Sequence, residues 1–177
     1  MTSCNRPLKM LIRIGGGVDG IQDYLEKGKK AGREFTREDL DERVFLAGDL
    51  SLTNSIIQSM DTDGEKYLHV TLGFGEDFVD AATLQKVAND FQQFAFSAYT
   101  KDEYSFYAEA HLPKIKSYVD KATGKEVFRK PHIHIVIPKT NLITGKTLDP
   151  FPPRTKRLPN GVTIVVDQQS MRSNQMI

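Results

Sequence analysis

Pro131-His-Ile-His-Ile-Val-Ile-Pro138 is the stretch that decides the fold of this 177-residue chain. Successive side chains of a β-strand point to opposite faces, so His132 and His134 would share one face. The alternate isoleucines would share the other face, where helices can bury them. The pattern therefore predicts a strand with an apolar face toward the core and a histidine face available for chemistry.

The rest of the chain supplies further strands and helices, but not in strict alternation. Turn residues at 122–124 predict a β-hairpin between two of the strands, and Thr36-Arg-Glu-Asp39 resembles a capping box before Leu40, Val44 and Leu46. A fold with this order is expected to be α+β, with an antiparallel central sheet and helices packed on one face. The other predicted elements are strands at 8–14 (ended by Gly15–Gly17), 67–74, 104–112 and 162–166, and helices at 18–30, from Ser51 or Thr53 to Met60, and at 80–98.

Composition is that of an ordinary globular protein, with 39% hydrophobic and 27% charged residues and a net charge of +1. The length predicts one domain over residues 1–177, with a flexible tail at about 168–177. The single cysteine, Cys4, excludes an internal disulfide and fits a cytoplasmic location. No segment approaches the ~18 apolar residues of a membrane span.

A third histidine, His111, ends the predicted strand 104–112. If that strand lies beside the one that carries His132 and His134, three imidazoles meet on one face. Three nitrogen ligands with open positions suit a divalent metal that does chemistry, and Zn²⁺, Mn²⁺, Fe²⁺, Co²⁺ and Ni²⁺ all accept such a set.

Two further side chains accompany this histidine trio. Glu109 has the same parity as His111, so it is a fourth ligand, a partner that orients an imidazole, or a solvated charge at the rim. His69 lies in Tyr67-Leu-His-Val-Thr-Leu-Gly-Phe74. It either approaches the site from another strand or has a hydrogen-bonded structural role.

Two segments, Ala108-Glu-Ala-His-Leu112 and Lys130-Pro-His-Ile-His-Ile-Val-Ile-Pro-Lys-Thr-Asn141, resemble the metal motif of conjugative relaxases. These enzymes are HUH endonucleases, named for histidine, hydrophobe, histidine. The resemblance covers roughly residues 8–145 and includes the strand 67–74. It implies an HUH-like fold, and it places Asn141 among the groups around the metal ligands.

The resemblance also implies a mechanism, in which a tyrosine hydroxyl attacks DNA and forms a 5′-phosphotyrosine link. The matching position is Tyr24, in Gly20-Ile-Gln-Asp-Tyr-Leu-Glu-Lys-Gly28, and Tyr107 is the next candidate. Phenols ionise near pH ~10, so such a nucleophile needs a neighbouring cation or base. The expected cofactor is Mg²⁺ or Mn²⁺, with Zn²⁺, Co²⁺ or Ni²⁺ as substitutes. The expected partners are single-stranded or hairpin DNA at an origin of transfer, and accessory mobilisation proteins.

Basic residues cluster near these motifs and are the expected contacts to DNA phosphates. The acidic runs 38–42 and 61–65 balance their charge and are expected to face away from DNA. The predicted DNA-binding residues are Lys27, Lys29, Lys30, Arg33, Arg129, Lys130 and Lys139.

Three alternatives stay open. A rolling-circle replication initiator would use the same chemistry, although many of them place the tyrosine after the metal motif. A cupin-type metalloenzyme would need neither Tyr24 nor the basic clusters, but no histidine follows His134. A DNA-binding relative that does not cleave would bind an origin without metal.

Overall fold

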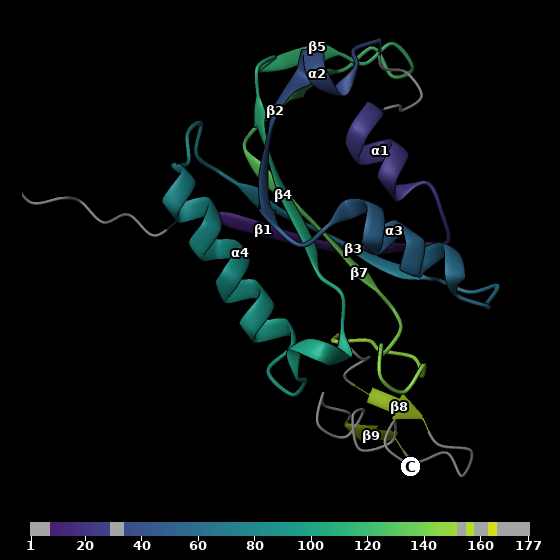
Figure 1. Ribbon diagram of the computed structural model, residues 1–177. Helices are drawn as coiled ribbons and strands as arrows, with labels where there is room; N and C mark the ends of the chain where they lie inside the picture. Colours follow the sequence, from purple (N-terminus) through teal and green to yellow (C-terminus); the bar gives the residue numbers. More distant parts are fainter. Residues whose placement is uncertain (1–7, 29–33, 152–154, 158–162, 166–177) are drawn as a thin grey trace, which may run out of the picture.

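The computed structural model describes residues 8–28, 34–151, 155–157 and 163–165 (Figure 1). The helices, with one 3₁₀ turn (η1), are α1 (Ile21–Lys27), α2 (Arg37–Leu40), α3 (Leu50–Ser59), α4 (Ala81–Ala95) and η1 (Lys101–Glu103). The strands are β1 (Met10–Gly17), β2 (Asp41–Ala47), β3 (Tyr67–Phe74), β4 (Tyr107–Pro113), β5 (Ser117–Val119), β6 (Glu126–Phe128), β7 (His132–Pro138), β8 (Thr155–Arg157) and β9 (Thr163–Val165).

A five-stranded antiparallel sheet is the centre of the fold, in the order β1-β3-β7-β4-β2. The predicted α+β class and antiparallel central sheet are therefore confirmed. The strand with the two histidines, β7, lies in the middle, and the predicted hairpin, β5–β6, connects β4 to it. The two histidine-bearing strands are thus direct neighbours, although about twenty residues of chain separate their motifs.

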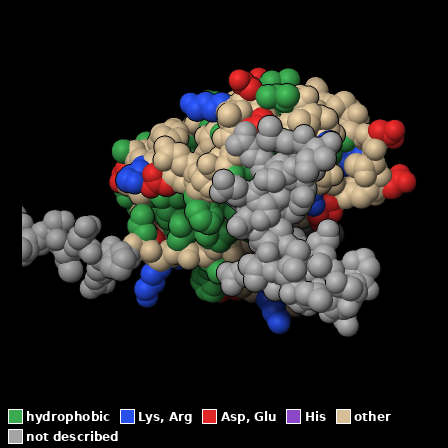
Figure 2. All heavy atoms as spheres, turned by 90° about the horizontal axis from the view of Figure 1, so that it is seen from below, with side chains coloured by type: hydrophobic (Ala, Val, Ile, Leu, Met, Phe, Trp, Pro, Cys, Tyr) green, Lys and Arg blue, Asp and Glu red, His purple; other side chains and the backbone are tan. Residues whose placement is uncertain are grey.

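One face of the sheet forms the main core with α4. Asp80 caps this helix, since its side chain accepts a hydrogen bond from the backbone N–H of Thr83 at 2.8 Å. The buried residues of α4 recur at helical spacing and meet alternate side chains of β3, β4 and β7. They are Leu84, Ala88, Phe91 and Ala95. Figure 2 shows hydrophobic side chains gathered on part of the visible surface, and no histidine is seen in this view.

The opposite face, which carries the histidines, is also partly covered by helices. Ile21 and Leu25 of α1 and Leu50 and Ile57 of α3 pack in a second buried cluster with β-strand residues such as Val136. In Figure 1, α1 and α3 lie on the other side of the sheet from α4. The expectation that helices pack on one face is therefore wrong. Short amphipathic helices supply this second layer, because β7 places an apolar Val136 among its histidines.

Residues 41–47 form the edge strand β2 rather than a helix. The predicted capping box at Thr36 and Asp39 is present, but the helix it starts ends at Leu40. The spacing of Leu40 and Val44 fits a helix, whereas the alternation of Val44 and Leu46 fits a strand. Pairing with β4 decides between them, and it includes a register shift between Phe45 and Ala47.

The glycines at 15–17 continue β1 instead of ending it, since all three pair with β3. A Cβ at Gly17 would lie 2.3 Å from the hydroxyl oxygen of Tyr67, so a larger residue there would require the Tyr67 side chain to move. The cap of α3 is Asp49, not Ser51 or Thr53. The predicted strand near 162–166 is present as β9, paired with β8, which was not expected; the predicted tail lies outside the described residues.

Candidate metal centre

The sheet register brings the three histidines together. His132 on β7 lies directly opposite His111 on β4, and His134 lies opposite Glu109. Paired residues of antiparallel strands point to the same face, with side chains close enough to touch. One nitrogen from each of the three imidazoles lies within 4.8 Å of the others. The trio predicted from sequence is therefore assembled, and it could hold a metal ion.

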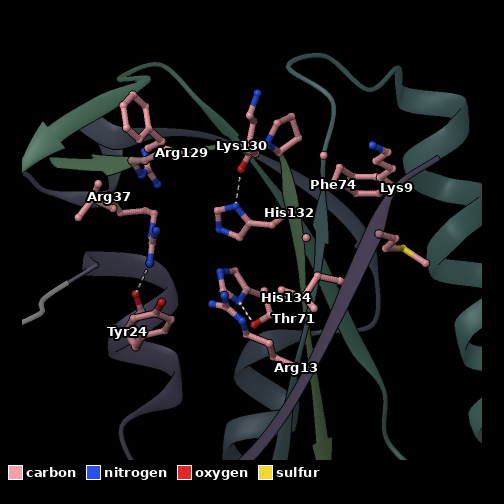
Figure 3. A pocket seen from close by; sticks show the side chains of 17 residues that line it. Lys9, Arg13, Tyr24, Arg37, Thr71, Phe74, Arg129, Lys130, His132 and His134 are labelled. Carbon is pink, nitrogen blue, oxygen red and sulfur yellow. Dashed lines mark hydrogen bonds between the residues drawn. The ribbon is translucent and has the colours of Figure 1, made fainter.

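Hydrogen bonds leave one lone pair on each imidazole for this purpose. Nδ1 of His132 lies 2.8 Å from the carbonyl of Lys130 and must donate to it, so Nε2 keeps its lone pair (Figure 3). His111 contacts the Glu109 carboxylate through Nε2, and its Nδ1 is buried without a partner in the described part of the chain. Nδ1 of His132 and Nε2 of His111 are thus held by hydrogen bonds, while Nε2 of His132 and Nδ1 of His111 can face an ion.

His69 provides the same support for His134. Its Nε2 lies 2.8 Å from Nδ1 of His134, whose Nε2 is buried and has no hydrogen-bond partner among the described residues. If Nδ1 of His134 donates in this bond, the lone pair on its Nε2 is available to a metal. His69 is thus next to the site, where it orients a candidate ligand. His69 therefore approaches the site from another strand and also has a hydrogen-bonded role, the two possibilities that the sequence left open.

Burial keeps these imidazoles neutral, which is the form that binds metals. It lowers the pKa of His132 to about 4, and the neighbouring His111 adds to the effect. Burial likewise lowers the pKa of His69 to about 4 and that of His134 well below its ordinary value. The pKa of His111 is also lowered by burial, although Glu109 opposes the shift.

Glu109 is a buried hydrogen-bond partner of His111 and not a solvated charge at the rim. Burial alone would raise its pKa, but hydrogen bonds from His111, Arg43 and Tyr107 lower it to about 2. The guanidinium of Arg43 donates to both carboxylate oxygens, at 3.1 and 2.6 Å. An ionised Glu109 can only accept, so it fixes the N–H of His111 at Nε2.

Tyr107, the rival nucleophile, is poorly suited to attack. Its hydroxyl donates to Glu109 at 2.5 Å, and burial followed by the Glu109 charge raises its pKa strongly. Tyr24 is placed differently, because its half-buried ring lies edge-on to the rings of both His69 and His134, with centroids 5.8 Å apart in each case. The structure thus brings the predicted nucleophile beside the predicted ligands.

Sequence reasoning missed Asp41, a buried carboxylate at the start of β2. It accepts hydrogen bonds from Arg37 at 2.8 Å and from Arg129 at 2.7 and 2.8 Å, and it lies 3.8 Å from Nδ1 of His111. Asp41 belongs to the acidic run 38–42, yet it is buried beside the candidate metal site. Had β2 been recognised as a strand, its edge position beside β4 would have indicated that a side chain here can approach His111.

The predicted DNA-binding residues have different surroundings. Lys27 forms an exposed ion pair with Asp23, and Lys130 one with Asp77. The Arg129 side chain is buried against Asp41. Lys139 pairs with Glu65 and Asp149 beyond the far end of β7 from His132. The remaining three, Lys29, Lys30 and Arg33, lie outside the described residues.

Asn141 is not among the groups around the histidines. Its amide donates to Glu103, and its oxygen accepts from the backbone N–H groups of Ile143 and Thr144. These bonds stabilise the turn that follows β7, at the opposite end of the strand from His132. The role that the resemblance assigns to Asn141 does not fit this position.

A cavity of about 550 Å³ opens beside Tyr24, His132 and His134 (Figure 3). No aspartate or glutamate is among its described lining residues. Gly73, which pairs with His132, has no side chain to fill the cavity. The aromatic and other apolar lining residues include Phe74 and Phe128. The basic lining residues are Lys9, Arg13, Arg37, Arg129 and Lys130.

None of the helices in the described ranges combines the length and the apolar character needed to cross a bilayer. Comparison with known proteins finds no matching family, no similar curated protein and no similar solved structure.

Proposed function

We propose that this protein is an HUH-type nuclease that nicks and rejoins single-stranded DNA through Tyr24, as a plasmid or integrative-element relaxase does. One observation carries the proposal. The ring centroid of Tyr24 lies 5.8 Å from that of a candidate metal ligand, His134, at a cavity whose described lining residues include basic side chains and no carboxylate. Positively charged lining residues favour binding of a negatively charged phosphodiester between the proposed nucleophile and the candidate metal site.

The reaction is a transesterification, so it needs no other reactant. The hydroxyl oxygen of Tyr24 forms a bond to phosphorus, and the bond between phosphorus and the 3′ oxygen breaks. The phenol loses its proton, and the released 3′ oxygen gains one. The product is a 5′-phosphotyrosine link with a free 3′ hydroxyl, and the reverse reaction rejoins the strand.

The histidine trio supports a divalent cofactor. When bound, such an ion supplies a Lewis acid that polarises a phosphate oxygen. The proposed cofactor is Mg²⁺ or Mn²⁺, and imidazole nitrogens favour Mn²⁺ over Mg²⁺, which prefers oxygen ligands. The imidazoles of His111, His132 and His134 would hold the ion. Zn²⁺, Co²⁺ and Ni²⁺ fit the same donors.

The cavity lining supports nucleic acid as the substrate. The cations of Arg13 and Lys130 suit phosphates, and the exposed ring of Phe128 suits base stacking. Single-stranded DNA fits better than duplex, because stacking on a side chain requires an unpaired base. The proposed biological partners, an origin of transfer and accessory mobilisation proteins, follow from the relaxase resemblance.

Covalent trapping tests the proposal. The protein is incubated with Mn²⁺ and a random-sequence single-stranded DNA library labelled at the 3′ end, which the 5′-phosphotyrosine link would retain. Denaturing gels should show a labelled protein adduct, and sequencing of the captured strands would identify the cleaved site. Tyr24→Phe, which keeps the ring but removes the hydroxyl, should abolish the adduct, as should His134→Ala.

The other possible outcomes of covalent trapping would indicate a different nucleophile or a different function. An adduct that survives Tyr24→Phe would show that another residue is the nucleophile. DNA binding without an adduct, even with the library, would favour the relative that does not cleave. Absence of DNA binding together with tight Mn²⁺ binding would favour a small metalloenzyme.

A further inference from the structure

Arg37 connects the helix of Tyr24 to the rest of the site. Its Nη2 donates to the backbone carbonyl of Tyr24 at 3.0 Å, and its Nε donates to that of Leu25 at 3.1 Å. Both carbonyls lie near the C-terminal end of α1, and that of Tyr24 also accepts a hydrogen bond from the backbone N–H of Gly28 at 3.0 Å. A buried guanidinium thus holds the backbone of the very residue that we propose as the nucleophile.

The same guanidinium also borders the Tyr24 ring. Its central carbon lies 5.2 Å from the ring centroid, and Figure 3 shows Arg37 reaching toward Tyr24 from above. The rings of His69 and His134 border Tyr24 as well. The position of the tyrosine is thus defined by one cation and two imidazoles, one of which is a candidate metal ligand.

Asp41 fixes Arg37 in turn. Its carboxylate accepts from Nη1 of Arg37 and, through both oxygens, from Arg129, which lies between the β5–β6 hairpin and β7. It also lies 3.8 Å from Nδ1 of His111. A single buried carboxylate therefore joins the nucleophile helix, the base of the hairpin and a metal-ligand strand.

We propose that Arg37, anchored by Asp41, is a positioning residue that holds Tyr24 against the metal site. This inference rests on the proposed function. Arginine suits the role because its planar fork can donate to two carbonyls and a carboxylate at once, whereas lysine offers one compact charge. Reactions of this kind depend on geometry, and a misplacement of about 1 Å can cost roughly 100-fold in rate.

Arg37→Lys is the main test, since it keeps the charge and removes the fork. We expect adduct formation in single turnover to fall about 10- to 100-fold. Mn²⁺ affinity, measured by electron paramagnetic resonance titration, should stay within about twofold, because no metal ligand changes. Binding of a labelled oligothymidylate should also stay within about twofold, because lysine keeps the positive charge at this position of the cavity lining. Leu84→Ala, which removes a buried side chain of α4 from the main core, is the control for lost stability. All rates are compared at equal distance below each melting temperature.

Nuclear magnetic resonance provides a readout that needs no activity. In the wild-type protein, nuclear Overhauser effects should connect the Tyr24 ring to the His134 ring, and the Nε–H of Arg37 should exchange slowly. Arg37→Lys should weaken the contacts between the rings, while Leu84→Ala should preserve them. This measurement on the wild type also decides the matter if the variant fails to fold.

Two results would overturn the inference. One is an adduct rate in Arg37→Lys equal to that of the Leu84→Ala control. The other is the absence of ring contacts and of a protected Nε–H in the wild type. If the wild type forms no adduct but shows these contacts, the proposed function fails while the positioning of Tyr24 by Arg37 stands.

Discussion

The two faces of the central strands differ in how their side chains are held in place. On β7, Ile133 and Ile135 are fully buried in the α4 core, where contact is non-directional and depends on volume. On the other face, His132 and His134 are held by hydrogen bonds with defined donors and acceptors. The comparison shows that neighbouring residues of one strand can be held by different physics, one set by packing in the core and the other by directional hydrogen bonds.

Removing a candidate ligand should have the largest effect. His134→Ala is expected to abolish tight Mn²⁺ binding, because two nitrogen ligands remain and a cavity replaces the third. Titration followed by electron paramagnetic resonance measures it. The fold should survive, since the main core on the opposite face is unchanged. Undiminished Mn²⁺ affinity would exclude His134 as a ligand.

Ile135→Ala, one residue along the strand, should show the opposite pattern. The lost packing and the resulting cavity should lower the free energy of unfolding by about 2–5 kcal/mol. Urea denaturation measures the loss. Mn²⁺ affinity of the folded protein should stay within about twofold of the wild type, given the separation of the two faces. A large fall in affinity would show that the two faces are coupled.

Acid should weaken only the contribution of the histidine face. Unfolded histidines take up protons near pH 6.5, whereas burial holds the pKa of His69 and His132 at about 4 in the fold. The unfolded state therefore binds more protons, so the free energy of unfolding should fall by about 4 kcal/mol between pH 6.5 and 4.5, roughly 2 kcal/mol from each imidazole. Urea denaturation in a chelator across this range measures it.

The carboxylates contribute little to the change in unfolding free energy between pH 6.5 and 4.5. Glu109, with its pKa lowered to about 2, contributes stability that is lost only at lower pH. The stability difference between Ile135→Ala and the wild type should be the same at every pH. A wild-type stability that is level from pH 6.5 to 4.5 would contradict neutral, buried imidazoles.

Glu109→Gln should have a smaller effect on the site itself. Loss of the carboxylate weakens the orientation of His111, so Mn²⁺ affinity should fall about 10- to 100-fold. Glu103→Gln is the matched control, because Glu103 is also buried but hydrogen-bonds with Thr100 and Asn141, away from the histidines. Equal losses of Mn²⁺ affinity in both variants would indicate general destabilisation.

The smallest predicted effect concerns two exposed phenylalanines, one in the cavity lining and one outside it. Phe128 on β6 lines the cavity, whereas Phe94 on α4 does not, and their exposed fractions are similar, at 74% and 70%. Phe128→Ala should weaken oligothymidylate binding by about 1 kcal/mol, roughly fivefold. Phe94→Ala should leave it unchanged. Fluorescence anisotropy measures both, and equal affinities would exclude stacking on Phe128.

Much of this arrangement was predictable from alternation along single strands. Parity placed His132 and His134 on one face, and it placed Glu109 with His111. Tyr24 came from the resemblance to relaxases, and the structure locates it beside His134. The predictions for the histidines and Glu109 needed only local sequence and one assumption, that β4 and β7 are neighbours, which the register confirms.

The parts that could not be predicted depend on contacts between distant segments. Asp41 becomes part of the site only because β2 pairs with β4, and its partner Arg129 is 88 residues away. The bond between Arg43 and Glu109 spans 66 residues. Local spacing around Leu40 favoured a helix, and only the sheet edge offered by β4 overrides it. The positions of α1 and α3 on the histidine face have the same origin.

The β5–β6 hairpin leaves the sheet between two strands that remain paired, so His111 and His132 stay opposite each other whatever the length of the excursion. Evolution can therefore lengthen, shorten or exchange this segment without moving the ligands. Its attachment point, Arg129, would have to be kept. In such a layout, the hairpin can change while the candidate metal ligands keep their positions.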